Sequence, residues 1–451
     1  MNTMPQRILS ALILISGVFA SASVSAAITA PEADRLGKDL TPVGAERAAS
    51  KDGLIPAWDG GLTKPPAGWN PDQGYVDPFP DDMPKVTITA QNLDQYKDKL
   101  APGVVELLKK YPNFKMPVYE SRRTAAYPAQ VNERIKAQAT KAALDGYSVK
   151  DLGNSTVPFP IPKNGQEAIQ NHMVRYLGGG FERHYNSFPV RANGDYYKVG
   201  FREYRIWDEN FDQHVDNRLL SFLGFYTNPP TLEGTIYLVH EPIDQVKESR
   251  EAWIYNAGSR RVRRAPDLAY DNVSDGTEGM RVTDQFDAYN GALDRYDWTL
   301  VGKKELYVPY NAYRLGDKKL KYTDILQKNT VNADLMRYEA HRVWVVEGVL
   351  KPGSRHIYGK RTFYLDEDSW TVLMEEAYDT RGNLWRVGVH PLIQYYDVSV
   401  PFYAANIIHD LSNGNYICSA LANEVKEPMK WGVKAKMAEF NPDALRRAGI
   451  R

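Results

Sequence analysis

The chain has 451 residues, and its 56 lysines and arginines balance its 56 aspartates and glutamates, so that the net charge is zero. Proteins that bind nucleic acid through its phosphates need a strong positive excess, and this balance argues against a nucleic-acid partner. The length allows more than one domain and a large core. The single cysteine, Cys418, has no disulfide partner within the chain, and its apolar neighbours predict a buried thiol.

Residues 1–26 have the pattern of a secretory signal peptide. Arg7 precedes an apolar run too short to span a bilayer, and small residues follow that run. Val24 and Ala26 predict cleavage after Ala26, and no cysteine stands there to carry a lipid anchor. No later segment reaches the ~20 apolar residues of a transmembrane helix. We therefore expect a periplasmic protein that is soluble after cleavage.

Residues 27–162 are expected to form an irregular, partly helical N-terminal arm. Proline and glycine are frequent and no period persists, so the segment must wrap on other parts of the chain to become ordered. Thr89 is a candidate cap, and Pro102 and Pro128 suit a first helical turn. Three helices are predicted in the arm, at residues 88–100, 101–112 and 127–146.

Residues 163–425 are expected to form an antiparallel β domain, followed by a C-terminal tail at 426–451. From about Gly194, aromatic and β-branched runs such as "GTIYLVHEP" and "RTFYLDE" are separated by short turn segments, which is typical of strands joined by hairpins. The segments "NAGS" (256–259) and "DTRGN" (379–383) fit hairpin turns. No helix-length segment alternates with the strands, which disfavours a parallel α/β fold. The predicted fold class is mainly β (α+β).

The valine-rich run at residues 342–350 has two apolar faces. Strand alternation places Trp344, Val346 and Leu350 on one face and Val343, Val345, Glu347 and Val349 on the other. One interpretation is a sheet covered by ordinary core on both sides. The other is that Trp344 and Val346 line a ligand cavity.

The sequence contains no recognisable catalytic, metal or cofactor motif. The eight histidines are scattered, and none has the spacing of a zinc pair. The segment from Asp271 has Gly276 at the offset of a calcium loop, but Val282 stands where that loop needs a glutamate. Residues 366–368 could supply paired carboxylates, and a polar turn between two strands is the favoured interpretation. We expect no enzymatic activity and no cofactor.

Four phrases in the chain resemble a family of exported proteobacterial proteins that is catalogued as a domain of unknown function, type 1329. They are "LGKDLTPVGAERAASKDGLIPAWDGGL", "VYESRRTAAYPAQV", "VPFPIPKNGQEAIQNHMVRY" and "RVWVVEGVLKPGSRHIYGKRTFYLDEDSWTVLMEEAYDTRGNLWRV". The likeness covers nearly the whole chain after residue 26. This family is in turn more distantly similar to the LolA and LolB proteins, which sort lipoproteins to the outer membrane.

The resemblance implies a fold and a function. The implied fold is an open, strongly curved antiparallel half barrel with short helices in its concave face, and in such carriers that face shelters acyl chains. Members are often encoded near exporters of the resistance-nodulation-division type and outer-membrane proteins. The resemblance therefore predicts a carrier or chaperone for a lipid, lipoprotein or other hydrophobic molecule. Its expected partners are an acylated or hydrophobic ligand, an inner-membrane exporter and an outer-membrane protein. A non-enzymatic adaptor of an envelope complex is the alternative, and a periplasmic hydrolase comes third.

The segment "EAWIYNAGSRRVRRAP" (251–266) concentrates four arginines around one valine. As a hairpin it has no good core face on its second strand, which predicts a sheet edge where arginines discourage unwanted pairing. A functional alternative makes this edge the rim of a binding site. In that case Arg261 and Arg263 meet an anionic head group while Trp253 and Tyr255 turn toward the ligand.

Overall fold

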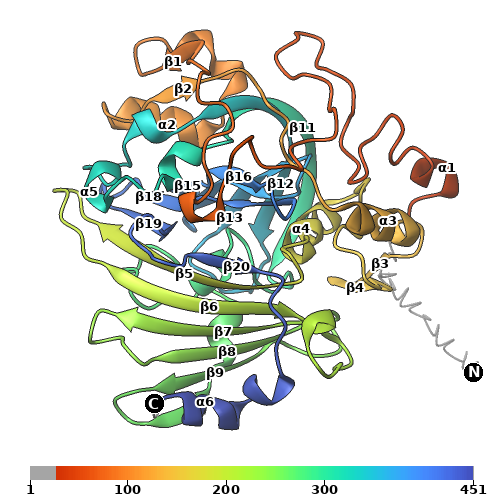
Figure 1. The fold of residues 1–451 in the computed structure, drawn as a ribbon, viewed down its shortest axis with the longest axis vertical. Helices are drawn as coiled ribbons and strands as arrows, with labels where there is room; N and C mark the ends of the chain where they lie inside the picture. Colours follow the sequence, from red (N-terminus) through yellow and green to blue (C-terminus); the bar gives the residue numbers. More distant parts are fainter. Residues whose placement is uncertain (1–26, 450–451) are drawn as a thin grey trace, which may run out of the picture.

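A single open sheet of sixteen strands dominates the described part of the protein (Figure 1). The structure is a computed structural model that describes residues 27–449. The strand order is β1–β2–β12–β13–β14–β15–β18–β19–β5–β6–β7–β8–β9–β10, with β11 paired to β12 and β20 paired to β5 beside this path. Its pairings are antiparallel except for the contact of β12 with β2. The mainly β fold and the open antiparallel sheet predicted from the sequence are confirmed.

The elements have the following bounds. The strands of the main sheet are β1 (Val86–Ile88), β2 (Met116–Val118), β5 (Gly180–Val190), β6 (Val199–Trp207), β7 (Arg218–Asn228), β8 (Ile236–Pro242), β9 (Glu251–Asn256), β10 (Arg261–Arg264), β11 (Tyr296–Pro309), β12 (Tyr338–Leu350), β13 (Lys360–Asp366), β14 (Val372–Tyr378), β15 (Leu384–Val389), β18 (Asn406–Asp410), β19 (Tyr416–Leu421) and β20 (Met429–Trp431). Two separate hairpins are β3 (Ala143–Asp145) with β4 (Ser148–Lys150) and β16 (Leu392–Tyr395) with β17 (Val400–Tyr403). The α-helices are α1 (Ala30–Ala33), α2 (Pro102–Lys110), α3 (Ala129–Gln138), α4 (Gly165–Val174), α5 (Tyr322–Ile325) and α6 (Pro442–Gly449).

The sheet curves around one buried cluster. Leu220 of β7, Phe181 of β5 and Phe363 of β13 all belong to this cluster, although several strands separate β7 from β13 in the sheet. Strands so far apart can share a cluster on one face only if the sheet bends toward that face. This face is therefore concave, as the sequence resemblance implied.

Part of the concave face is filled by the chain itself. Helix α4 packs on β11 and β12 and contributes Ala168 and Ile169 to the concave cluster, while the β16–β17 hairpin contributes Ile393 and Phe402. Asn164 starts α4 by accepting a hydrogen bond from the backbone N–H of Glu167 over 2.9 Å. Short elements in the concavity thus cover the strands around β12.

The opposite face of the same strands is covered by the arm. Helix α2 packs on β15 and buries one apolar side, including Val104 and Leu107, in the cluster that also contains Val343 and Val345 of β12. Pro102 occupies its first turn, and the free N–H of Gly103 donates to the Glu376 carboxylate over 2.7 Å. Both faces of this half of the sheet are therefore core.

The C-terminal residues cover the outer face of the other half of the sheet. Leu445 of α6 and Phe440 pack with Leu238 of β8 and Ile206 of β6 in a separate cluster. Figure 1 shows α6 beside β9 at the far end of the sheet from the arm. Residues 426–449 thus contribute both β20 and this helical cover.

Two of the three predicted arm helices need correction. Residues 102–110 of the predicted 101–112 form α2. The predicted helix at residues 88–100 is instead two single 3₁₀ turns, at 93–95 and 97–99, because the backbone leaves the helical region at Asn92 and Tyr96, with φ of −123° and −120°. The third helix, α3, ends at Gln138 instead of residue 146. Gly146, with φ of +62°, turns the chain there into the β3–β4 hairpin.

Both predicted hairpin turns are confirmed. β9 pairs with β10 around residues 257–260, and β14 pairs with β15 around residues 379–383. β10 ends the strand order, so the arginine-rich strand is an edge strand, as its two polar faces predicted. Cys418 is fully buried in β19, which confirms the prediction for the thiol.

Candidate functional site

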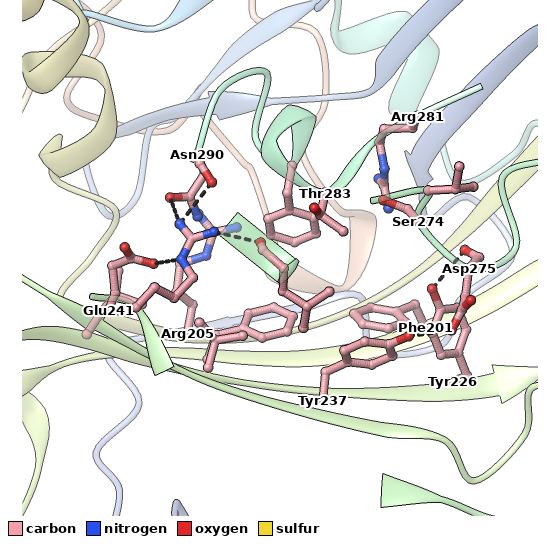
Figure 2. A pocket seen from close by; sticks show the side chains of 17 residues that line it. Phe201, Arg205, Tyr226, Tyr237, Glu241, Ser274, Asp275, Arg281, Thr283 and Asn290 are labelled. Carbon is pink, nitrogen blue, oxygen red and sulfur yellow. Dashed lines mark hydrogen bonds and ion pairs between the residues drawn. The ribbon is translucent and has the colours of Figure 1, made fainter. Parts of the chain in front are cut away.

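The floor of a cavity is built from the concave face of β6, β7 and β8. Phe201 lies opposite Tyr226 and Arg205 opposite Phe222 in the β6–β7 ladder, so these side chains share one face. The Phe201 and Tyr226 ring centres are 4.9 Å apart, and those of Tyr226 and Tyr237 are 6.0 Å apart. Figure 2 shows these rings lying side by side beneath the cavity.

Gly224 allows the aromatic rings to close over the strand backbone. A Cβ at this position would lie 2.5 Å from the Phe201 ring and 2.8 Å from the Phe222 ring. The position opposite it on β8 holds Tyr237. The glycine therefore makes room for three large rings on adjacent strands.

The roof is the segment between β10 and β11, residues 265–295, which we call the cover loop. Leu268 and Phe286 of the cover loop and Leu220 and Val239 of the sheet line a cavity of about 110 Å³. Burial raises the pKa of Tyr226 well above its ordinary value, so the phenol keeps its proton as a hydrogen-bond donor. The concave face is thus open to a ligand between β6–β8 and the cover loop.

Two tyrosines of the floor hold the cover loop at Asp275. The Tyr226 hydroxyl donates to the Asp275 backbone carbonyl over 2.9 Å, and the Tyr237 hydroxyl donates to its carboxylate. Val273, next to this contact, is 60% exposed although it lines the cavity. This end is therefore the mouth of the cavity.

The opposite end is closed by buried charges. Asp287 of the cover loop accepts hydrogen bonds from Arg175 over 2.6 Å and from Arg205 over 2.9 Å. Burial opposes ionisation of Asp287, but the two guanidinium groups outweigh it and hold the pKa well below the ordinary value. The carboxylate is therefore charged at neutral pH and anchors the end of the loop.

Comparison with known proteins gives the chain a family. Residues 87–446 match the family described as a protein of unknown function, DUF1329. The chain belongs to this family. It is 46% identical to an uncharacterized protein of Pseudomonas aeruginosa strain PAO1, over 98% of this chain and 99% of that protein. The membership predicted from the four sequence phrases is confirmed.

Several solved structures are similar to this DUF1329 chain. One is a domain named after outer membrane lipoprotein sorting from Vibrio parahaemolyticus, 15% identical, with a TM-score of 0.45 over 63% of this chain and 98% of that one. Another is a DUF1329 family protein from Desulfovibrio piger, 14% identical, with a TM-score of 0.41 over 60% of this chain and 92% of that one. A third is a LolA superfamily protein from Nitrosomonas europaea, 11% identical, with a TM-score of 0.38 over 62% of this chain and 99% of that one.

The structure covers only part of the predicted export features of this DUF1329 chain. The expected signal peptide, residues 1–26, lies outside the described residues. Within residues 27–449, no helix combines the length and the apolar character that a membrane crossing requires.

The structure does not place Trp253 and Tyr255 at the cavity. On β9 they lie opposite Leu238 and Ile236, on the outer face of the sheet, where the C-terminal residues cover them. The Tyr255 hydroxyl donates to the carbonyl of Gly449 over 3.2 Å. These rings are therefore used for packing against the C-terminal helix.

Arg261 and Arg263 lie on the other face of β10. Arg263 is opposite Ile254, which is opposite Tyr237 of the cavity floor. Both arginines are exposed, and neither forms an ion pair with a residue in the described range 27–449. They stand at the rim of the concave face, separated from Trp253 by the sheet itself.

Trp344 and Val346 lie in the half of the concave face that is already filled. Val346 is fully buried in the concave cluster. The Trp344 ring stacks on Trp370 with centres 6.3 Å apart, and the Lys303 ammonium lies 4.9 Å from it. The six predicted residues thus lie in three different places, and only Arg261 and Arg263 are on the face of the sheet that carries the cavity.

Sequence reasoning missed the cavity floor and the cover loop. The alternation of Phe201, Arg205 and the other residues of "YYKVGFREYRIW" is a usable signal for one shared face. The cover loop has no period, and the only pattern in its sequence is the incomplete calcium loop that starts at Asp271.

One cluster of buried side chains has the composition of a metal site. Donor atoms of His341, Asp366 and Asp368 lie within 4.8 Å of one another. Arg123 of the arm holds Asp368 with two hydrogen bonds of 2.7 and 2.9 Å, and His341 lies 3.1 Å from Glu339. Both oxygens of Asp368 thus accept hydrogen bonds from the Arg123 guanidinium. The cluster therefore fastens the arm to the turn at residues 366–369, which the sequence predicted as a turn and the structure buries.

Proposed function

We propose that the protein is a periplasmic carrier or chaperone for a hydrophobic or acylated molecule, working with an envelope transport system. The observation that carries the proposal is the aromatic cavity on the concave face of β6–β8 under the cover loop. Aromatic walls with a few polar groups are typical of small-molecule sites.

The energetics favour such shelter for an acyl chain. Exposing a chain to water costs about 0.8 kcal/mol per methylene, so even a short chain gains several kcal/mol in an apolar cavity. The cavity volume of about 110 Å³ is below the roughly 150 Å³ of an engineered cavity that binds benzene. The closed form therefore takes only the first carbons of a chain, and a longer chain requires the cover loop to lift or passes out at the mouth.

Bound-lipid analysis tests the carrier function. The protein is purified from its own periplasm without detergent, and native mass spectrometry and lipid extraction are compared for three chains. We expect the wild type to carry an apolar ligand reproducibly. Val239→Trp, which fills the cavity from the floor, should lose this ligand, and Val349→Trp should keep it. Val349 is an exposed strand valine and is the matched control. Empty wild-type protein with no affinity for fluorescent acyl probes contradicts the proposal.

A second candidate function is an adaptor that holds no ligand. The observation that favours it is the filling of the concave face near β12 by α4 and the β16–β17 hairpin. Crosslinking in intact cells distinguishes the two functions. If the protein is an adaptor, the yield of its crosslinked protein partner should be the same in Val239→Trp as in the wild type. If it is a carrier, Val239→Trp should lose the crosslink to the partner that receives the ligand.

A further inference from the structure

Arg281 differs from the other arginines around the cavity. Arg205 pairs with Asp287 and Arg250 pairs with Glu241. Among residues 27–449, the Arg281 side chain forms neither an ion pair nor a hydrogen bond, and its Nε is buried without a partner. Its guanidinium carbon lies 5.6 Å from the centre of the Phe286 ring. The cavity wall therefore contains an uncompensated cation.

Arg281 also separates two different spaces. On one side is the apolar cavity. On the other is a small space of about 20 Å³ lined by Arg183, Ser419, Asn406 and Asp287, whose carboxylate is already paired with Arg175 and Arg205. The Ser419 hydroxyl is buried there and has no hydrogen-bond partner within the described chain. Unsatisfied polar groups of this kind cost free energy unless a ligand or water completes them. The small space has room for about one water, which can complete the Ser419 hydroxyl. Arg281 therefore stands where the apolar cavity meets a polar region.

The position of Arg281 fits an amphiphile that enters by its tail. The Ser274 N–H donates to the Arg281 carbonyl over 3.0 Å, so both residues lie at the same end of the cover loop as Asp275. Figure 2 shows Arg281, Ser274 and Asp275 together at one end and Glu241 and Asn290 at the other. A charged head can thus stay near the mouth while the chain lies over the apolar floor.

We propose that the cavity binds a single-chain anionic amphiphile, a carboxylate or phosphate monoester, whose head group pairs with Arg281 and whose chain lies over Leu220 and Phe222. This assignment rests on the carrier function and gives its ligand a charge. Apolar walls strengthen the pairing, because a charge-assisted hydrogen bond is worth more away from water. The Asp275 carboxylate is the opposing group at the mouth, where the Tyr237 hydroxyl already engages it.

Calorimetry with three probes of equal chain length tests the charge. Octanoate, octyl phosphate and 1-octanol are titrated below their critical micelle concentrations into the purified full-length protein. We expect octanoate or octyl phosphate to bind at least about tenfold more tightly than 1-octanol, the difference that one charge-assisted hydrogen bond provides. The tighter of the two anions identifies the head group as carboxylate or phosphate.

Variants assign the effect to Arg281. In Arg281→Gln the anion should bind no more tightly than 1-octanol. The affinity for 1-octanol should stay as in the wild type, which shows that the cavity is intact. Asp275→Asn should tighten anion binding by removing the opposing charge. Arg264→Gln, on the outer face of the edge strand, is the matched control and should behave as the wild type.

The outcomes separate the two proposals. If 1-octanol and the anions bind equally and Arg281→Gln changes nothing, the assignment of an anionic ligand is overturned while the carrier function stands. If none of the probes binds the wild type, both are overturned.

Discussion

The guanidinium of Arg250 and the carboxylate of Glu241 form a buried ion pair with Nε 2.7 Å from Oε2. The same guanidinium donates to the Leu268 carbonyl over 3.0 Å and to the backbone and side-chain oxygens of Asn290 over 2.9 and 2.8 Å. Leu268 lies near the start of the cover loop and Asn290 near its end. One side chain, directly before β9, therefore fastens both ends of the cover loop to the sheet.

The variant Arg250→Met should release the cover loop and lower stability. It leaves Glu241 charged and buried without its partner, which typically costs about 3–5 kcal/mol. Urea denaturation measures the loss, and hydrogen exchange should show faster exchange at residues 265–295. Arg264→Met is the control, because its pair with Glu251 is exposed and is worth at most about 1 kcal/mol. Equal losses in the two variants would contradict this role for Arg250.

The variant Gly165→Ala should disturb the helix that fills the concave face. A Cβ at Gly165 would lie 2.8 Å from the backbone of Thr299 in β11, and backbone cannot move aside as a flexible side chain can. We expect α4 to shift and the free energy of unfolding to fall by about 1–3 kcal/mol. Gly316→Ala is the matched control, since no atom lies within 4 Å of its added Cβ. If the Tm of Gly316→Ala falls as much as that of Gly165→Ala, crowding against β11 is not the cause of the lost stability.

Buried His172 should make the protein less stable in acid. Burial, and then the nearby Arg175 cation, lower the pKa of His172 to about 3, so the folded protein does not take up the proton that the unfolded chain binds below about pH 6.5. The stabilisation is present above that pH and is lost as the pH falls, by about 2 kcal/mol between pH 6.5 and pH 5.

The variant His172→Gln removes this titration while keeping a donor for the Asp287 carbonyl, which lies 2.8 Å from Nε2. Its stability should therefore fall less steeply than that of the wild type when urea denaturation is repeated from pH 7 to pH 5. Parallel curves for wild type and His172→Gln would show that the ring does not control the acid response.

Asp366 should have the opposite pH dependence. Burial, and then the nearby Asp368 carboxylate, raise the pKa of Asp366 to about 6, and its Oδ1 has no hydrogen-bond partner in the described chain. The folded state therefore keeps a proton that the unfolded state has lost. This stabilisation is present below about pH 4 and is lost as the pH rises through 6, with a total on the order of 3 kcal/mol.

The variant Asp366→Asn should keep that stabilisation at all pH values. Its amide oxygen can still accept from the Ser369 hydroxyl, which lies 2.6 Å from Oδ2 in the wild type. We expect similar stability to the wild type at pH 4 and higher stability at pH 8, measured by urea denaturation. Asp81→Asn, at an exposed site, should change neither value. A variant that is less stable than the wild type at pH 8 would contradict the raised pKa.

The strands and their faces could largely be predicted from the sequence, because they depend on local alternation. Arginines on both faces of residues 260–264 predicted an edge strand, and "NAGS" and "DTRGN" predicted the hairpin turns. The two apolar faces of residues 342–350 allowed two interpretations, core on both sides or a ligand cavity at Trp344 and Val346, and β12 has core on both sides.

The site could not be predicted in the same way, because it depends on contacts between distant segments. Trp253 and Tyr255 seemed suited to a ligand, but residues 440–449 cover their face, and nothing local to β9 signals this contact. The cavity exists because Gly224 and the register of three strands bring Phe201 and Tyr237 under a loop that has no period of its own.

The double variant Arg261→Ser and Arg263→Ser should weaken binding to an anionic surface without lowering stability. Both side chains are exposed on an edge strand, and neither forms an ion pair with a residue that the structure describes. The free energy of unfolding should therefore change by no more than about 0.5 kcal/mol. Each cation near an anionic membrane is worth about 1 kcal/mol, so vesicle affinity should fall by about thirtyfold. Sedimentation with vesicles containing phosphatidylserine measures the change, and the exposed arm pair Lys51→Ser and Lys64→Ser is the control. If vesicle affinity is unchanged and the double variant self-associates instead, the two arginines protect the strand edge, because charged side chains there prevent pairing with a second chain.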